Sequence, residues 1–200
     1  MKKIAVLVSG GGTNLQALID DDISIELVIS SKKNAYALTR ATEANIKTEI
    51  VEWVEYKELK NKIGLFIGRW KFSQAILNIL LDNDIELVVL AGFMVILTGR
   101  ICKAYPNAML NVHPSLIPAF SGRGFYGLKV HRAALERGVK LSGATVHFVN
   151  NVCDGGQIIL QKAVEVLDDD TPETLQARVM RVEREILPQA VRLICGNEKE

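Results

Sequence analysis

The chain has 200 residues, 48% of them hydrophobic, and a formal net charge of +1. This length and composition predict a single globular domain over residues 1–200 and exclude an intrinsically disordered chain. A nearly neutral chain lacks the positive field that nucleic acid or an anionic membrane surface selects. We therefore expect small-molecule substrates, with neither nucleic acid nor a membrane as a partner.

Apolar runs and cysteines indicate a cytoplasmic protein. No apolar run approaches the ~18 residues of a membrane span. The run IAVLV at residues 4–8 is also shorter than the apolar core of a signal peptide. The three cysteines, Cys102, Cys153 and Cys195, are scattered and form no CxxC pair. This usage predicts reduced thiols and a cytoplasmic location.

Short β-rich runs alternate along the chain with segments of helical periodicity. The predicted strands are Lys3–Ser9, Ile25–Ser30, Lys47–Val51, Leu87–Gly92, Ala108–Val112, Ala144–Asn150 and Gln157–Val166. The predicted helices are Asn14–Asp20, Asn34–Ala44, Trp70–Asp82, Gly127–Arg137 and Thr171–Leu193. The run LVVLA has no polar alternation, which is typical of a central parallel strand covered on both faces. The pattern predicts an α/β fold with a Rossmann-like, doubly wound and mostly parallel sheet.

The C-terminal part of the chain refines this fold. Because no long helix separates the last two predicted strands, we expect them to form an antiparallel pair. Thr171 and Pro172 supply the N-cap and the first residue of the final helix. The tail NEKE is expected to be frayed.

The stretch SGGGTNLQ, residues 9–16, lies where the first predicted strand ends and the first helix begins. In doubly wound sheets, ligands bind beyond the carboxyl ends of the strands. A helix N-terminus offers free N–H groups to an anion, and glycine lets a phosphate approach the backbone. The dinucleotide pattern GxGxxG fails at Leu15, and no GK[ST] follows. We predict a phosphate monoester on the backbone amides and the Thr13 hydroxyl; the alternative is a tight turn without a ligand.

The stretch NVHPSLIP, residues 111–118, supplies two polar side chains. Asn111 and His113 are two residues apart on a strand, so they point to the same side, and Pro114 ends the strand. Asp154 follows a later strand in the glycine-closed loop of HFVNNVCDGG. Amide and imidazolium N–H groups suit an oxyanion that develops on a carbonyl carbon, and a neighbouring carboxylate favours the imidazolium. The alternative for Asp154 is a turn residue before Gly155, since no sequence argument alone places it beside His113.

The remaining candidate residues carry weaker signals. His147 alternates with Val146 and Phe148 and is a second polar group expected near the site, whereas His131 falls within a helix and is expected to be structural. The histidines show no metal-ligand spacing such as HExxH, so no metal is expected. Cys153 adjoins Asp154 and is interpreted as a small apolar filler.

Three stretches of the chain match a known family in their order and spacing. They are SGGGTNLQ, LAGFMVIL running into NVHPSLIP, and GATVHFVNNVCDGG. Together they resemble the phosphoribosylglycinamide formyltransferase family, from Lys3 to about Pro188. The resemblance implies the formyltransferase fold and an enzyme of purine biosynthesis. Such an enzyme transfers the formyl group of 10-formyltetrahydrofolate, its co-substrate, to the amine of 5-phosphoribosylglycinamide. A monomer and a homodimer both remain open.

The resemblance also implies roles for individual residues. The catalytic Asn, His and Asp of the family match Asn111, His113 and Asp154, and Thr145 matches the hydroxyl residue that supports the Asp and its bound water. The implied substrate residues are Gly12, Thr13 and Asn14 for the phosphate and Glu183 for the ribose. The implied folate residues are Arg69 near the glutamate tail and Met94, Val95, Ile96, Leu97, Asn111, Asn150 and Asp154 around the pterin.

Three positions depart from the family pattern. Val95 stands where Arg or Lys is common, and Ser121 and Gln157 stand where Pro is usual. None of the three belongs to the catalytic trio, so the departures concern folate affinity and loop geometry.

Other functions stay open. A 10-formyltetrahydrofolate hydrolase uses water as the acceptor, and such chains usually carry an extra N-terminal regulatory domain, whereas the fold here is expected to start at Lys3. A methionyl-tRNA formyltransferase would carry a C-terminal tRNA-binding domain, which is not expected within these 200 nearly neutral residues. The alternative from another class is a non-catalytic module that binds nucleotides or folates. The complete polar trio favours an enzyme.

Overall fold

The computed structural model describes residues 2–56 and 62–196, and the tail NEKE lies outside them. In this described part the strands form a seven-stranded sheet in the order β3-β2-β1-β4-β5-β6-β7. The pairs β1–β2, β1–β4 and β2–β3 are parallel and β6–β7 is antiparallel, so the predicted α/β fold is confirmed. The chain divides into two compact units, Met1–Leu110 and Asn111–Glu200. A single domain over the whole chain stays a prediction.

The first unit contains four parallel strands, β1 (Ile4–Val8), β2 (Leu27–Ser30), β3 (Lys47–Ile50) and β4 (Leu87–Leu90). Every residue of β1, β2 and β4 is buried, whereas the edge strand β3 is partly exposed. The sequence predicts that an uninterrupted apolar run is a strand covered on both faces. The burial of β1 and β4 confirms this explanation of their apolar runs.

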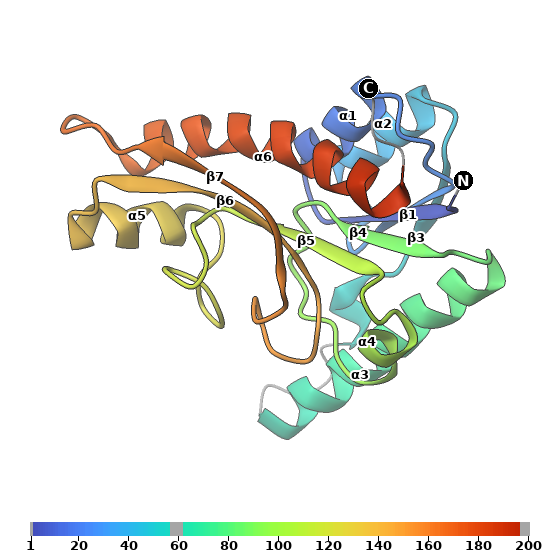
Figure 1. Cartoon of the computed structure of the whole chain (residues 1–200). Helices are drawn as coiled ribbons and strands as arrows, with labels where there is room; N and C mark the ends of the chain where they lie inside the picture. Colours follow the sequence, from blue (N-terminus) through green and yellow to red (C-terminus); the bar gives the residue numbers. More distant parts are fainter. Residues whose placement is uncertain (1, 57–61, 197–200) are drawn as a thin grey trace. The chain divides into compact units, whose positions relative to one another are not determined.

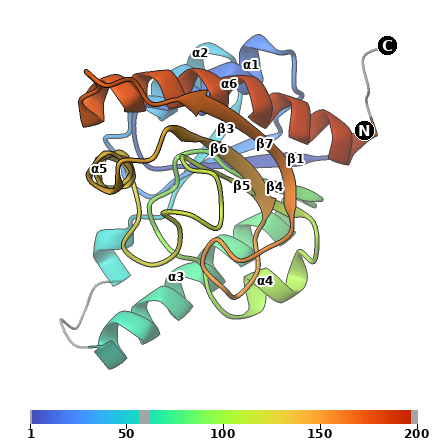
Figure 2. The same ribbon diagram turned by 60° about the vertical axis from the view of Figure 1, so that its left-hand side comes forward.

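The helices of the first unit are α1 (Thr13–Asp20), α2 (Tyr36–Glu43), α3 (Lys62–Asp82) and α4 (Arg100–Ala104), with a 3-10 turn, η1, at Trp53–Tyr56. Within this unit, α1 and α2 lie on one face of the strands and α3 and α4 on the other (Figures 1 and 2). The prediction that α3 begins at Trp70 is wrong. The missed turns contain Ile63 and Phe66, which are 71% and 64% exposed, whereas their buried positions are the glycines Gly64 and Gly68, so no apolar stripe marks them as helical.

The second unit contains β6 (Leu141–Phe148), β7 (Ile158–Glu165), α5 (Leu128–Arg137) and α6 (Pro172–Cys195), and its boundary with the first unit falls within β5 (Met109–His113). The predicted antiparallel pair is confirmed, with Leu141 opposite Glu165. Helix α6 packs along both strands and against α5 (Figure 1). Its predicted start is also confirmed, because the Thr171 hydroxyl accepts a hydrogen bond from the Thr174 N–H at 3.2 Å.

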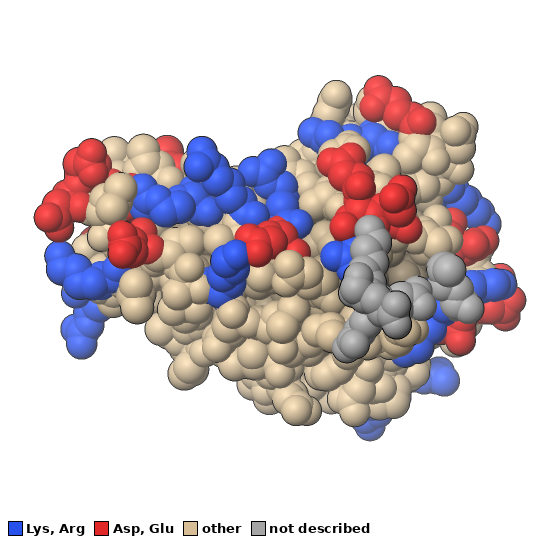
Figure 3. All heavy atoms as spheres, turned by 45° about the horizontal axis from the view of Figure 1, so that its top comes forward, with Lys and Arg blue, Asp and Glu red and all other residues tan. Residues whose placement is uncertain are grey.

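Charge is mixed on the surface around α6. Figure 3 shows Lys and Arg side chains over this helix with Asp and Glu side chains among them. Glu185 on α6, for example, pairs with Lys162 on β7. Across residues 2–56 and 62–196, no helix has both the length and the apolar character needed to cross a membrane.

Candidate active site

The end of β5 presents two polar side chains. Asn111 and His113 are its third and fifth residues, and Pro114 follows directly. His113 is 5% exposed, and its Nε2 lies 3.0 Å from the backbone oxygen of Phe120. The Asn111 amide nitrogen lies 3.1 Å from Nε2 of His147 on β6. The strand thus carries both side chains to one place, as the two-residue spacing predicts.

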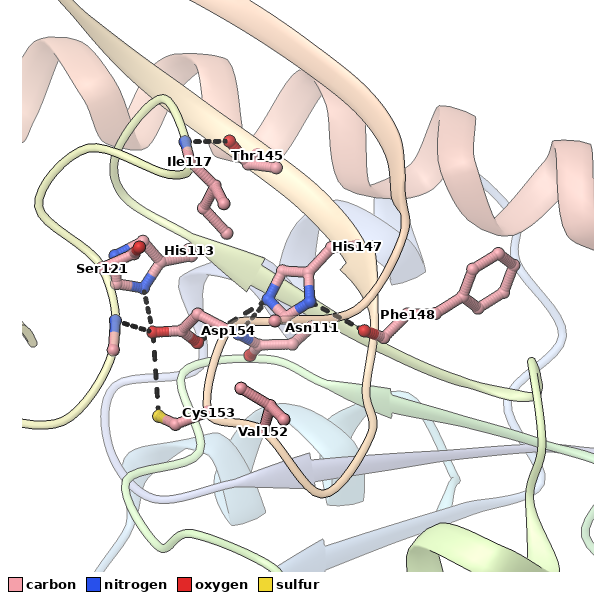
Figure 4. A network of polar contacts seen from close by, with 12 residues as sticks. Asn111, His113, Ile117, Ser121, Thr145, His147, Phe148, Val152, Cys153 and Asp154 are labelled. Carbon is pink, nitrogen blue, oxygen red and sulfur yellow. Dashed lines mark hydrogen bonds and ion pairs between the residues drawn. The ribbon is translucent and has the colours of Figure 1, made fainter.

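Asp154 lies beside both histidines (Figure 4). Its Oδ2 is 3.6 Å from His113 Nδ1, and its Oδ1 is 3.7 Å from His147 Nε2. Oδ2 also accepts a hydrogen bond from the Gly122 N–H at 2.8 Å. Asp154 has a φ of 54°, so it is both a turn residue and a member of the polar cluster. The sequence left this contact open, and the structure makes it.

The glycines after Asp154 have a packing role. A Cβ built on Gly156 would lie 1.7 Å from the backbone oxygen of Phe148, and one on Gly155 would lie 2.5 Å from a methyl carbon of Val152. Asn150 braces the same turn, since its Oδ1 accepts the Val152 N–H at 2.8 Å. The Phe148 backbone and the Val152 side chain therefore close the turn that presents Asp154 and leave no room for side chains at the two glycines.

The two nitrogens of His113 face oxygen atoms. Nε2 donates to a backbone carbonyl, which is only an acceptor, and Nδ1 faces the Asp154 carboxylate. A neutral ring with its proton on Nε2 would point a lone pair at the carboxylate, whereas the imidazolium points an N–H. Only a ring that carries a proton on each nitrogen can donate to both of these oxygen atoms. The 3.6 Å Nδ1–Oδ2 contact is longer than a hydrogen bond, so this N–H is the one that a substrate oxygen can compete for.

The contacts of His147 favour a neutral imidazole ring. It is 2% exposed, and its Nδ1 lies 2.8 Å from the backbone oxygen of Phe148. Nδ1 therefore carries a proton, and the neutral ring keeps a lone pair on Nε2 that accepts from Asn111. Burial is the main cause that lowers the pKa of His147. Its alternation with Val146 and Phe148 was the sequence signal for this residue.

Thr145 holds the segment that follows His113. Its hydroxyl donates to the Ser115 oxygen at 2.6 Å and accepts from the Ile117 N–H at 3.1 Å. It also accepts from Nε2 of Gln161 at 2.9 Å, so its donor and both acceptor sites are used. The expected support of Asp154 by Thr145 stays a prediction. Gln161 belongs to no recognised motif, so its hydrogen bond to Thr145 could not be predicted from the sequence.

A second buried histidine gives a prediction about stability and pH. His131 on α5 is 1% exposed, and burial, followed by the charge of His113, lowers its pKa from 6.5 to about 4. Between these values the unfolded chain binds a proton that the folded chain does not, so the free energy of unfolding must fall as the pH falls. The expected loss is about 3 kcal/mol.

Urea unfolding at about pH 7 and about pH 4.5 measures most of this loss, about 2.4 kcal/mol. The variant His131→Gln should show a flatter dependence, because it removes the group that titrates. An equal slope in the variant and the wild type would assign the effect to other groups.

In the first unit, the glycine loop is pinned by α2. The Ala37 N–H donates to the Gly10 oxygen at 3.0 Å, and Arg40 Nε donates to the Gly11 oxygen at 2.9 Å. Since N–H and C=O point in opposite directions across a trans peptide, the N–H groups of Gly11 and Gly12 point away from these two partners. The Ala37 N–H and Arg40 therefore each orient one of the amides that the sequence assigns to an anion, those of Gly11 and Gly12 respectively.

The three glycines differ in what surrounds them. Gly12 has a φ of 72°, and a Cβ built on it would lie 2.7 Å from Ala37 Cβ. For Gly10 and Gly11, nothing lies within 4 Å of such a Cβ. Gly12 is thus required by its backbone conformation and by packing, whereas Gly10 and Gly11 border open space where a ligand can approach.

These differences predict distinct outcomes for two substitutions. Gly11→Ala should raise the KM for a phosphate-bearing substrate roughly tenfold, with a nearly unchanged melting temperature, because a methyl group there would meet only the ligand. Gly12→Ala should lower the melting temperature as well, because it strains the backbone and crowds Ala37. Steady-state kinetics and thermal unfolding of both variants test this. A KM unchanged in Gly11→Ala would contradict the phosphate assignment.

The segment expected to hold the pterin is tied to the same part of the first unit. The Met94 N–H donates to Ser9 Oγ at 2.9 Å, and Ser9 directly precedes Gly10. Met94 is 52% exposed and Leu97 is 6% exposed, with half-buried Val95 and Ile96 between them. The segment thus combines an exposed apolar residue with a buried anchor.

The structure therefore brings the sequence-predicted residues together in two groups. The group in the second unit is Asn111, His113, Asp154 and the added His147, with Thr145 and Asn150 bracing the adjoining segments. The group in the first unit is Gly12, Thr13, Asn14 and the segment from Met94 to Leu97. Arg69 lies half-buried on α3, and Glu183 lies buried on α6.

Known proteins resemble this chain over nearly all of its length. The trifunctional purine biosynthetic protein adenosine-3 of Homo sapiens is 42% identical over 200 residues, which cover 97% of this chain. The chain spans 18% of the length of that relative and of its counterparts in Gallus gallus and Bos taurus. The phosphoribosylglycinamide formyltransferase of Haemophilus influenzae is 39% identical, and the match covers 96% of this chain and 86% of that protein.

A solved structure gives the same result in three dimensions. Glycinamide ribonucleotide transformylase 1 from Symbiobacterium toebii superposes with a TM-score of 0.84 at 40% identity, covering 98% of this chain and 89% of that one. The family model described as formyl transferase matches residues 2–191. These matches include relatives that align along most of their own length, and the chain therefore belongs to the phosphoribosylglycinamide formyltransferases within the formyl transferase family.

Proposed function

We propose that this chain transfers the formyl group of 10-formyltetrahydrofolate to the amine of 5-phosphoribosylglycinamide. Membership of the formyl transferase family implies a folate-type formyl donor, and the relatives named phosphoribosylglycinamide formyltransferase suggest the acceptor. The observation that carries the proposal is the cluster of Asn111, His113 and Asp154, with Asp154 Oδ2 at 3.6 Å from His113 Nδ1. We propose one catalytic domain over residues 1–200, acting in the cytoplasm.

The cluster has the groups that the transfer needs. When the amine attacks the formyl carbon, a C–N bond forms, the carbonyl oxygen becomes negative and the attacking nitrogen becomes positive. The second N–H of Asn111 and the Nδ1–H of His113 are donors for the negative oxygen. The carbonyl then re-forms, the bond from the formyl carbon to N10 of the folate breaks, and the proton from the amine passes to N10. Asp154 keeps His113 charged and, through a water, helps to move this proton.

The binding residues follow the family pattern. We propose that the substrate phosphate binds Gly12, Thr13 and Asn14, because the loop has open space at Gly10 and Gly11 and begins a helix. The apolar segment Met94, Val95, Ile96 and Leu97 is proposed to bind the pterin, together with Asn111, Asn150 and Asp154. Arg69 is proposed to contact the glutamate tail, and Glu183 the ribose.

A product assay tests the proposal against its alternatives. The purified chain is incubated with 10-formyltetrahydrofolate, with and without 5-phosphoribosylglycinamide, and the formylated product and free formate are measured. Formylated product that requires both substrates supports the proposal, and the Asn111→Ala variant controls for contaminating enzymes. Formate release without the amine would instead identify a hydrolase. Binding of both ligands without turnover would identify a binding module.

A further inference from the structure

We propose that His147 is a positioning residue that determines which end of the Asn111 side-chain amide faces the formyl oxygen. This inference rests on the proposed formyl transfer. It assigns to His147 no contact with the substrate, because the residue acts through Asn111. Its basis is the pair of contacts that the imidazole makes, one through each ring nitrogen (Figure 4).

The first contact sets the tautomer of His147. Nδ1 lies 2.8 Å from the backbone oxygen of Phe148, which can only accept, so the proton of the neutral ring is on Nδ1. Nε2 then has a lone pair and no proton. The group of Asn111 that lies 3.1 Å away must be a donor, and only the NH₂ end of an amide donates. The tautomer and the amide orientation therefore determine each other.

This pairing divides the hydrogen-bonding groups of Asn111. One N–H is given to His147, and the other N–H is left for a ligand oxygen. Reversing the amide would place its oxygen against the Nε2 lone pair, where two acceptors would face each other. A correctly oriented amide offers a donor without rearrangement, which is what stabilises a developing oxyanion.

The backbone fixes His147 in this position. The register of the β6–β7 pair shifts at this residue, since Val146 lies opposite Leu160 and His147 lies opposite Ile158. Ile159 is the extra residue of a bulge, and bulges beside active sites re-aim side chains. His147 is also 2% exposed, so its ring has little freedom to turn.

The charges around His147 act in both directions. Asp154 Oδ1 at 3.7 Å favours a charged ring, whereas burial and the charge of His113 oppose it. Burial is the largest of these effects, and the pKa of His147 is lowered. A charged ring would donate from Nε2, which would turn the amide oxygen of Asn111 toward it and draw Asp154 away from His113.

A double-mutant cycle tests the proposal with kcat and KM as readouts. The variant His147→Leu removes the acceptor, and we expect kcat to fall roughly 10–100-fold, as for other residues that orient a functional group, with KM changed far less. The variant His147→Gln restores an acceptor oxygen and should recover most of kcat. In the Asn111→Ala background, His147→Leu should lower kcat by less than about twofold, because the group that it positions is already gone.

The buried His131 supplies a matched control, since His131→Gln also removes a buried imidazole and should leave kcat nearly unchanged. Losses that multiply in the double variant, or wild-type kcat in His147→Leu, would overturn the proposal. If His147→Leu fails to fold, His147→Gln decides in its place: recovery supports the proposal and a large loss of kcat overturns it.

A measurement on the unmutated chain separates this inference from the proposed function. The ¹⁵N chemical shifts of the His147 ring in the wild-type chain report its tautomer without any turnover. A proton on Nδ1 supports the inference, and a proton on Nε2 at neutral pH overturns it. Failure of the wild-type chain to form any formylated product would instead reject the proposed function.

Discussion

Replacing Asn111 with alanine should lower kcat by roughly 10²–10³-fold, the usual consequence of losing one oxyanion donor. The amide is oriented before the substrate arrives, since one N–H is held by His147 at 3.1 Å. The lost interaction is made mainly in the transition state, where the formyl oxygen carries charge, so KM should change far less than kcat.

The Asn111 prediction has an isosteric control. Asn111→Asp keeps the shape of the side chain but replaces the N–H donor with an acceptor oxygen, so its loss of kcat should equal or exceed that of Asn111→Ala. Steady-state kinetics at saturating concentrations of both substrates make the comparison. A near wild-type kcat in Asn111→Ala would show that the Asn111 side chain takes no part in the chemical step.

Replacing Asp154 with asparagine should lower kcat by roughly 10²-fold or more, within the range of a group that assists proton transfer. The substitution keeps the size of the side chain and removes the negative charge that lies 3.6 Å from His113 Nδ1. Without that charge the imidazolium is less favoured, so the alkaline limb of the kcat profile should move to lower pH. The hydrogen bond from the Gly122 N–H can persist, because the asparagine oxygen accepts it.

The measurement is kcat against pH for the wild type and for Asp154→Asn. Cys153→Ala serves as the neighbouring control, since the Cys153 sulfur lies 3.8 Å from Asp154 Oδ2 but carries no charge in the proposed reaction. The control should keep the wild-type profile. An unshifted profile and near-normal kcat in Asp154→Asn would end the assignment of Asp154 to His113.

Local patterns predicted most of the fold because their causes are local. The apolar runs of β1 and β4 are covered on both faces, and the Thr171–Pro172 start of α6 depends on contacts within one helical turn. The first turns of α3 were missed because their large apolar side chains are exposed and their buried positions, Gly64 and Gly68, are glycines. The periodicity that reveals a helix comes from buried apolar side chains, and the buried positions of these turns carry none.

The site was predicted less completely, because its contacts join residues far apart in sequence. The pairing of Asn111 with His113 follows from strand alternation, but the approach of Asp154 depends on a turn with a φ of 54°. The role of Arg40 in pinning the glycine loop could not be read from the sequence either, since it depends on how α2 packs on Gly12. In each case tertiary packing adds what the local pattern lacks.

The closed turn around Asp154 predicts which of its residues a relative should keep after losing catalytic activity. A side chain at Gly156 would strike the Phe148 backbone whether or not the protein catalyses anything, so folding alone preserves that glycine. Folding alone does not require an aspartate before the two glycines, because asparagine and glycine also adopt the φ of 54° found at Asp154. A gene copy that has drifted away from catalysis should keep the glycine pair while the residue before it varies. When relatives are compared, the aspartate of the Asp-Gly-Gly triplet therefore distinguishes active from inactive copies, whereas the two glycines do not.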